Sequence, residues 1–235
     1  MIESLPLVLA LMAWGTIVGV DLVTFPQAMI SRPLVAGTVS GLLGAWLFPG
    51  VEGGSAITAG IAVGAVLELY ALDVLPIGAA RYPDYGPATV SAVYAALGVN
   101  LMAGLGAAVL CGLLVAVLGG WLIQWVRRAN ARAIQHRAAG LAAGDAAALR
   151  RLHRGGVTRD IARSAALMLI GLTLANLIWP VLPRGAENLT WLTIVAVGGG
   201  LAAALGGAVR SAGRTRRSFW LAAGLSAGLL VVLLT

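Results

Sequence analysis

Long stretches without charge dominate the pattern of apolar and polar positions along this chain. Six runs contain no Asp, Glu, Arg or His: residues 4–20, 33–51, 85–126, 164–183, 188–209 and 218–235. A helix needs about 20 largely apolar residues to cross the hydrocarbon core of a bilayer. Residues 85–126 are long enough for two crossings, or for one crossing plus a re-entrant hairpin. The pattern therefore predicts an all-α polytopic membrane protein with six to nine hydrophobic elements, re-entrant hairpins among them.

Composition supports this class. Hydrophobic residues make up 60% of the chain and charged residues 11%, whereas soluble domains carry roughly 25% charged residues. This number of charges is too small to cover the surface of a water-soluble protein. Lipid must therefore cover much of the surface. The first apolar run follows Glu3 without a basic segment, which indicates a retained first helix rather than a cleaved signal. Cys111 is the single cysteine, so an intrachain disulfide is excluded.

The positive charge is confined to the second half. Residues 1–126 contain two Arg and six acids, whereas residues 127–235 contain fourteen Arg and three acids. Nine of those arginines lie in residues 127–163 and four in residues 210–217. Short basic loops beside spanning helices mark the cytoplasmic side. We therefore expect both loops to be cytoplasmic, and we do not expect a nucleic-acid partner despite the net charge of +7.

Three regions follow from this distribution. Residues 1–126 form a Pro/Gly-broken membrane region, residues 127–163 a basic cytoplasmic loop, and residues 164–235 a three-helix membrane region. The second half then crosses outward over 164–182, turns over 183–190, crosses back over 191–209 and crosses outward again over 218–235. Trp179 and Trp191 flank the outer turn, where interfacial tryptophans are expected.

The basic loop itself contains a helix signal. Asp145 is placed to cap a short helix over residues 146–153, which Gly155 and Gly156 would end. One interpretation is a helical hairpin that lies on the inner membrane face with its arginines near anionic lipid. The other is a docking surface for a cytosolic partner. His136 and His153 are expected to be solvated loop residues.

The first half has sequence features that are common in transporters. Six prolines interrupt it, namely Pro26, Pro33, Pro49, Pro76, Pro83 and Pro87. Irregular backbone at membrane depth is tolerated only inside protein or beside a water-filled cavity, and broken helices commonly build a transporter's substrate site. Pairs of glycines four residues apart, at 15/19, 37/41, 60/64 and 224/228, are compatible with close helix contacts.

Glu68 is the first candidate site residue, because it follows an uncharged segment that begins at Gly60. An ionisable group in such a segment normally faces a polar interior or a partner. Glu68 either contacts a ligand or is a structural carboxylate bonded across helices to Arg32 or Arg81. Asp73 falls on a different helix face, and we expect it near an interface.

Asp84 is the second candidate. It lies in residues 76–87, where three prolines and two glycines exclude a regular helix throughout. A loop that dips into a cavity there would offer a carboxylate and aromatic rings to a sugar; the alternative is an ordinary extramembrane turn. Arg81 would be able to neutralise Asp84. Asp21, Gln27 and Arg32 form a further cluster, although Asp21 can also be read as a helix-end residue at the interface.

Taken together, these stretches resemble the EIIC component, a membrane subunit of the mannose/fructose/sorbose family of the bacterial sugar phosphotransferase system. The motifs that carry the resemblance are Asp21, the Arg-Pro-Leu-Val-Ala-Gly stretch from Arg32, the Leu-Glu-Leu stretch around Glu68, and Gly-Ala-Ala-x-x-Pro-Asp ending at Asp84. The match covers roughly residues 15–100. Arg81 and Tyr82 depart from the family pattern, which has smaller uncharged residues before Pro83.

The resemblance implies a sugar-translocating subunit in the bacterial plasma (inner) membrane. Its implied partners are a second membrane subunit, the EIID component, and the cytosolic EIIA and EIIB phosphocarrier subunits, with a hexose-type sugar as substrate. It implies no cofactor and no phosphorylated residue in this chain, since the partners transfer the phosphate. It also implies an all-helical fold with re-entrant hairpins, and substrate-binding or site-shaping roles for Glu68 and Asp84.

Two rival functions follow from the same sequence. A divergent permease-like scaffold or sensor would bind partners without transport, and the charge at Arg81 is compatible with it. An intramembrane enzyme is disfavoured, because the sequence contains no metal motif, nucleophile motif or phosphate loop. We therefore expect a transport subunit rather than an enzyme.

Overall fold

The computed structural model describes residues 4–48, 52–72, 82–97, 101–178 and 186–211. These residues form helices joined by short loops, with no strand among them, which confirms the predicted all-α class. In chain order the helices are α1 (Leu5–Val23), α2 (Pro33–Leu47), α3 (Gly53–Ala71), α4 (Tyr85–Leu97), α5 (Leu101–Gln135), α6 (Ala138–Ala142), α7 (Ala146–Ile178) and α8 (Ala186–Ser211).

Five of the described helices are long and apolar enough to cross a membrane: α1, α3, α5, α7 and α8. The run 85–126 divides into α4 and the first part of α5, so it contains one long helix and one short one. α4 has 13 residues and is about 20 Å long, too short for a hydrocarbon core of about 30 Å. Residues Gly86–Leu97 are buried on every face, which makes α4 the central element of the fold.

α2 and α3 form a tightly packed helical hairpin along their glycines. A Cβ added to Gly37 would lie 2.4 Å from the carbonyl oxygen of Gly60, and one added to Gly41 would lie 2.7 Å from that of Ala56. Only glycine permits such an approach between two backbones. The predicted close contacts at Gly37, Gly41, Gly60 and Gly64 are therefore confirmed. The pair at 224/228 lies outside the described residues.

α1 packs against α7 through its own glycines. A Cβ on Gly15 would overlap the Met168 side chain, and one on Gly19 would overlap Ser164 Oγ. The Ser164 hydroxyl donates to backbone carbonyls of α1, at 3.0 Å to that of Thr16. This contact brings the end of α1 beside the middle of α7.

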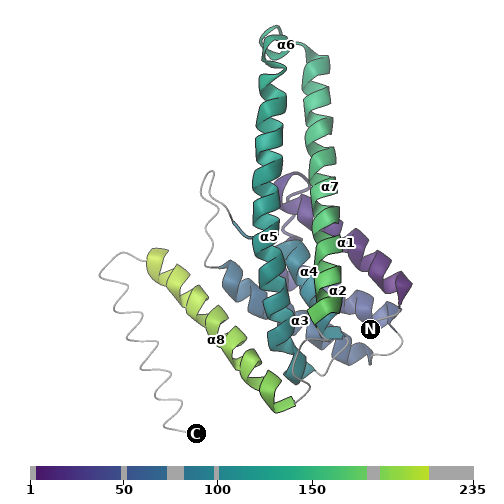
Figure 1. Ribbon diagram of the computed structural model, residues 1–235, viewed down its shortest axis with the longest axis vertical. Helices are drawn as coiled ribbons and strands as arrows, with labels where there is room; N and C mark the ends of the chain where they lie inside the picture. Colours follow the sequence, from purple (N-terminus) through teal and green to yellow (C-terminus); the bar gives the residue numbers. More distant parts are fainter. Residues whose placement is uncertain (1–3, 49–51, 73–81, 98–100, 179–185, 212–235) are drawn as a thin grey trace.

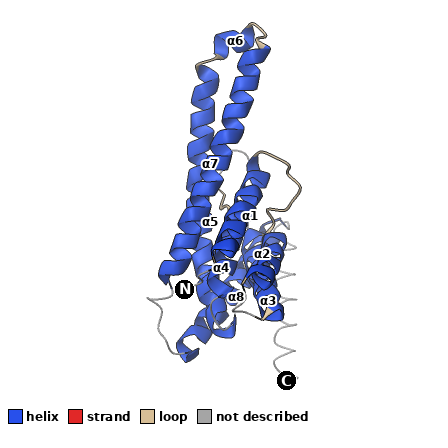
Figure 2. Cartoon of the chain, turned by 90° about the vertical axis from the view of Figure 1, so that its right-hand side faces the viewer, coloured by secondary structure: helices blue, strands red, loops and turns tan. Residues whose placement is uncertain are grey.

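Most of the basic region 127–163 is the upper part of a long helical hairpin, whereas Asp160 and Arg163 at its end are buried in the bundle. α5 and α7 continue in one direction beyond the other helices and meet at α6, so the hairpin projects from the bundle (Figures 1 and 2). It does not fold back across the end of the bundle. Asp145 caps α7 as predicted, since Ala147 N donates to its Oδ1 at 2.7 Å.

The predicted end of that helix at Gly155 and Gly156 is wrong. α7 runs through both glycines in helical conformation. Contacts with α5 hold this stretch, including a 2.6 Å hydrogen bond from Arg159 to Asn130, and such packing outweighs the weak helix propensity of glycine. α7 ends instead at Ile178, and the chain turns before it begins, at Gly144, which has a φ of +73°.

α8 closes the described bundle against α3 and α5. The Tyr70 hydroxyl donates to Ala196 O at 2.9 Å, and its ring lies over Gly199 and Gly200, so α8 packs closely against α3 at these glycines. α8 begins at Ala186, so residues 186–190 of the predicted turn over 183–190 are helical, and residues 183–185 lie outside the described part of the chain. The predicted crossing over 218–235 lies outside the described residues.

Candidate functional site

Asp21 organises the loop between α1 and α2. Its carboxylate is buried, with 1% exposed, and it accepts a 2.6 Å hydrogen bond from Ala28 N and a 3.0 Å bond from Ser31 N. Hydrogen bonds from backbone N–H groups to an ionised carboxylate are strong. The loop is thereby fixed although two of its residues, Gln27 and Met29, have positive φ angles. Asp21 thus lies at the end of α1, as one interpretation of the sequence had it, and is a buried anchor for the loop.

Arg32 and Glu68 form an ion pair at the end of the α2–α3 hairpin. Arg32 Nη2 lies 3.1 Å from Glu68 Oε1, and Leu34 N donates to Glu68 Oε2 at 3.3 Å. Glu68 therefore bonds a free N–H in the first turn of α2, a favourable place for a carboxylate. The Arg32 side chain is 52% exposed and that of Glu68 18%, so one side of the pair is open to the surroundings.

Arg163 joins three elements in the interior. Its guanidinium donates from Nη1 to Asp84 Oδ2 at 2.5 Å, from Nε to Asp160 Oδ1 at 2.7 Å and from Nη2 to the Gly19 carbonyl at 2.7 Å. Asp84 and Arg163 have fully buried side chains. The second oxygen of Asp84, Oδ1, is buried without a hydrogen-bond partner in the described part of the chain.

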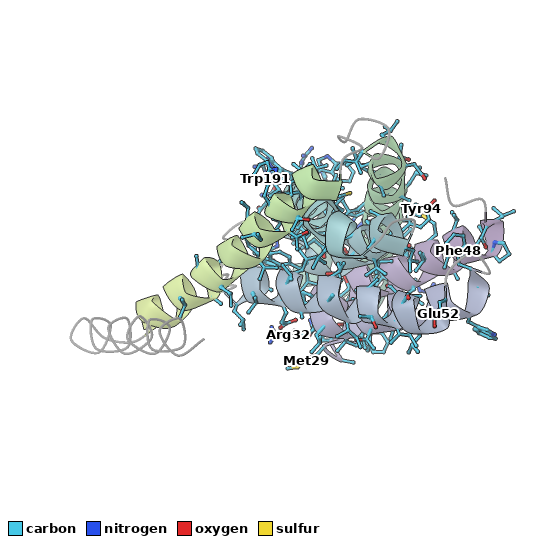
Figure 3. The ribbon with its side chains drawn as sticks, turned by 90° about the horizontal axis from the view of Figure 1, so that it is seen from below. Met29, Arg32, Phe48, Glu52, Tyr94 and Trp191 are labelled. Atoms are coloured by element: carbon cyan, nitrogen blue, oxygen red, sulfur yellow. The ribbon has the colours of Figure 1, made fainter. Side chains whose placement is uncertain are left out.

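The loop that Asp21 holds adjoins the start of α4. A Cβ added to Gly86 would lie 3.3 Å from the carbonyl oxygen of Ser31, so the chain just after Asp84 packs against the loop. Asp160 also accepts a hydrogen bond from the hydroxyl of Thr24, where that loop begins. Figure 3 shows Met29 and Arg32 together at one end of the α2–α3 hairpin, with Phe48 and Glu52 at the other. Asp21, the Arg32–Glu68 pair and the Arg163 network are therefore all joined to the α1–α2 loop.

A family model covers nearly all of the chain. Residues 6–221 match the family described as the sorbose-specific IIC component of the phosphotransferase system. The chain belongs to this family. It is therefore a multi-pass, sugar-specific membrane subunit of the IIC type, and the resemblance seen in the sequence is confirmed.

Solved structures agree on the fold of this IIC-type subunit. A chain described as a membrane protein has a TM-score of 0.67 at 20% identity, over 97% of this chain and 94% of that one. A chain of the mannose transporter ManYZ in complex with a microcin has a TM-score of 0.59 at 19% identity, over 99% and 96%. No curated protein matches the sequence.

In this IIC-type fold, four of the five predicted site residues take part in the described contacts. Asp21 folds the loop, Arg32 pairs with Glu68, and Asp84 pairs with Arg163. Gln27 lies in the same α1–α2 loop and is exposed. Of the two predicted partners for Glu68, Arg32 is observed; Arg81 and Asp73 lie outside the described residues.

Arg163 and Asp160 were not predicted as site residues. Both were assigned to the basic cytoplasmic loop, yet both are buried in the bundle. The signal available in the sequence was their spacing, because an acid and an arginine three residues apart share a helix face. They also stand directly before the apolar run that begins at Ser164.

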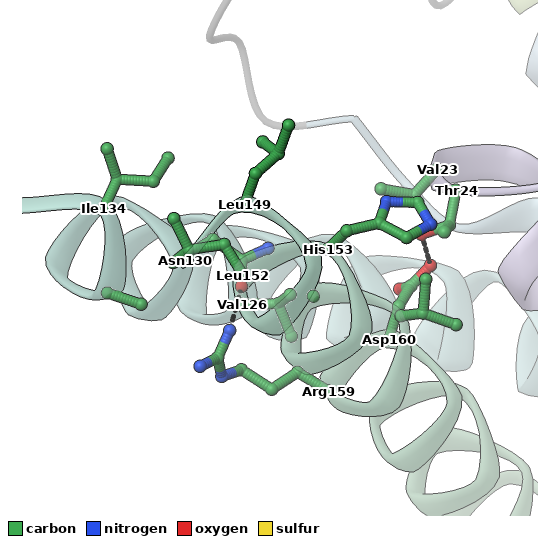
Figure 4. A pocket seen from close by; sticks show the side chains of 13 residues that line it. Val23, Thr24, Val126, Asn130, Ile134, Leu149, Leu152, His153, Arg159 and Asp160 are labelled. Atoms are coloured by element: carbon green, nitrogen blue, oxygen red, sulfur yellow. Dashed lines mark hydrogen bonds between the residues drawn. The ribbon is translucent and has the colours of Figure 1, made fainter. Parts of the chain in front are cut away.

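A pocket lies above this region, between the end of α1 and the projecting hairpin (Figure 4). It has a volume of about 440 Å³, and Thr24, Asn130, His153 and Asp160 are among its polar lining residues. His153 is nevertheless exposed, as is His136, in agreement with their prediction as solvated residues. Among the described residues, no group of three metal-ligating side chains gathers anywhere.

Proposed function

We propose that this IIC-type subunit translocates a hexose-type sugar across a bacterial plasma membrane. It would act with an EIID membrane component, while the cytosolic EIIA and EIIB subunits transfer phosphate to the sugar. The chain itself would perform no phosphoryl transfer. Family membership supports this role, and the hairpin 127–163 and the segment 210–217 would face the cytoplasm according to their arginines.

The open ion pair of Arg32 and Glu68 is the observation that carries the proposed site. A carboxylate and a guanidinium together offer acceptors and donors to sugar hydroxyl groups. The Arg32 side chain is half exposed. The pair adjoins the α1–α2 loop that Asp21 holds, and this loop carries Gln27. We assign substrate contact to Glu68, Arg32 and Gln27.

Asp21 and Asp84 have a different role in this proposal. Both carboxylates are buried and engaged by protein groups. They shape the site by fixing the α1–α2 loop and the start of α4. The region 1–126 would thus hold the sugar site, and the region from residue 164 would support it.

The test is sugar uptake by membranes that contain the whole complex. Glu68→Gln removes the charge at nearly constant size, and we expect it to abolish uptake while insertion and association with the EIID component persist. Glu52→Gln is a matched control, because Glu52 precedes the same helix at its other end and is exposed. Uptake that persists in Glu68→Gln would show that Glu68 is only structural.

A permease-like scaffold without transport is the second candidate. It is favoured by one observation: the three candidate carboxylates, Asp21, Glu68 and Asp84, already have protein partners. The wild-type complex decides between the two. Sugar-dependent phosphate transfer and uptake support the transporter, whereas association with partners and no sugar-dependent transfer support the scaffold.

A further inference from the structure

Arg163 occupies an environment that is costly for a charge. Its side chain has no exposed surface, and it lies in α7 among residues that face α1 and α4. Burial of an ion is favourable only when good geometry and hydrogen bonds replace its hydration. Here the guanidinium has three such bonds, at 2.5 to 2.7 Å. A residue kept at this cost in the interior of a membrane protein is a candidate for a functional role.

Each of the three bonds holds a different part of the fold. Asp160 is on α7 itself, one turn before Arg163. The Gly19 carbonyl is on α1, two residues before Asp21. Asp84 directly precedes α4, where the helix N-terminus also favours a carboxylate. One planar group therefore fixes the separation between the end of α1 and the start of α4.

The same network fixes the start of the α1–α2 loop. Asp160 accepts from Arg163 with Oδ1 and from the Thr24 hydroxyl with Oδ2. Beyond Thr24 the loop carries Gln27 and Arg32, which the proposed function assigns to substrate contact. A displacement of Arg163 would therefore move these residues relative to Glu68, although Arg163 itself has no contact with them.

Tight packing leaves little room for compensation. A Cβ on Gly119 would lie 2.5 Å from Asp84 Cβ, and one on Gly19 would overlap Ser164 Oγ. Lysine cannot reproduce the arrangement, because its ammonium is a point charge whereas the guanidinium is a planar fork with donors in fixed directions.

We propose that Arg163 is a positioning residue for the sugar site. By holding α1, Asp84 and α7 in fixed relative positions, Arg163 sets the apparent affinity for sugar. This proposal rests on the proposed transport function. It predicts a change in KM that a purely structural residue would not produce, because loss of folded protein lowers the maximal rate but leaves the KM of the remaining complexes unchanged.

The experiment measures sugar uptake over a range of sugar concentrations, normalised to the amount of assembled complex in the membrane. We expect Arg163→Lys to raise KM at least tenfold with a maximal rate within threefold of wild type. Arg159→Gln is the matched control, because Arg159 lies one turn earlier on α7, bonds Asn130 and forms no ion pair with any described carboxylate. We expect its KM to be unchanged.

Three further variants keep the test valid if a charge change impairs folding. Arg163→Gln leaves Asp84 and Asp160 without their cation, so we expect little assembled complex. Adding Asp84→Asn to it removes one of the two carboxylates, and we expect assembly to recover with KM still raised. Gly119→Ala displaces Asp84 without any change of charge, and we expect it also to raise KM.

The outcomes separate the two proposals. Unchanged KM in Arg163→Lys and Gly119→Ala, with wild-type uptake intact, overturns the positioning role and leaves the transport function standing. A wild-type complex that takes up no sugar overturns the transport function and, with it, this inference. Raised KM in both variants with an unchanged Arg159→Gln supports the inference.

Discussion

The glycine contact between α2 and α3 allows a prediction with a calculable size. In Gly60→Ala the new Cβ would lie 2.4 Å from the Gly37 carbonyl oxygen and 2.8 Å from Gly41 Cα. Ordinary contacts of this kind are about 3.5 Å, so the two helices must separate by about 1 Å. Both neighbours are backbone atoms, and a rotamer change therefore cannot relieve the overlap.

The cost should be measurable as a loss of stability. Overpacking of a well-packed interior costs roughly 1–3 kcal/mol. In a protein of this size each kcal/mol corresponds to roughly 2–4 °C in Tm. We therefore expect Gly60→Ala to lower the thermal midpoint in detergent by several degrees. Glu68 lies two turns further along α3, so the separation should also lengthen its bonds to Arg32 and Leu34 N and weaken sugar uptake.

Gly54→Ala is the control for this experiment. Gly54 lies in the first turn of α3, and a Cβ there would have no atom within 4 Å. Alanine is a better helix former than glycine by up to about 1 kcal/mol, so the midpoint should stay constant or rise. Thermal unfolding followed by scanning fluorimetry compares the two variants. Equal midpoints for Gly60→Ala and Gly54→Ala would refute the close α2–α3 contact.

Two other substitutions test separate contacts. Asp21→Ala leaves Ala28 N and Ser31 N without their acceptor, and a hydrogen bond to a charged group contributes roughly 1.5–3 kcal/mol. We expect faster limited proteolysis within residues 24–32 and weaker uptake, and a cleavage rate equal to that of wild type would contradict the anchoring role. Tyr70→Phe removes only the bond to Ala196 O, so we expect a loss of roughly 0.5–1.5 kcal/mol in stability and unchanged sugar uptake. An altered KM for sugar uptake would show that α8 contributes to the site.

The helical class and the glycine contacts followed from the sequence because they depend on local properties. Uncharged runs predict membrane helices through composition and length alone. Glycines four residues apart indicated close helix contacts without naming the partners, and the structure shows that the 37/41 pair of α2 opposes the 60/64 pair of α3. The division of residues 85–126 remained open, because an apolar run does not reveal where a short buried helix ends and a spanning helix begins.

The candidate site was predicted in part. Arg32 was one of two structural partners considered for Glu68, the other being Arg81, because residues 1–126 contain only these two arginines. Arg163 was missed for the opposite reason. It is one of nine arginines in residues 127–163, and the bias of such loops toward the cytoplasm explains the others without a specific partner. Only the tertiary fold shows that α7 carries this one into the bundle beside Asp84.

Gly155 and Gly156 illustrate the limit of local helix signals. Two adjacent glycines usually end a helix, yet α7 continues because its neighbours on α5 support it. The structure places the turn at Gly144, beside α6. Packing between the two long helices thus decides the length of the projecting hairpin.

Equilibrium binding of a labelled hexose tests the central claim most directly. The measurement uses the purified membrane complex of this chain with its EIID component, with wild type, Glu68→Gln and Glu52→Gln compared at equal folded concentration. We predict saturable binding by wild type and Glu52→Gln, and none by Glu68→Gln over the same range. Equal binding by wild type and Glu68→Gln would contradict the assignment of the sugar site to the Arg32–Glu68 pair.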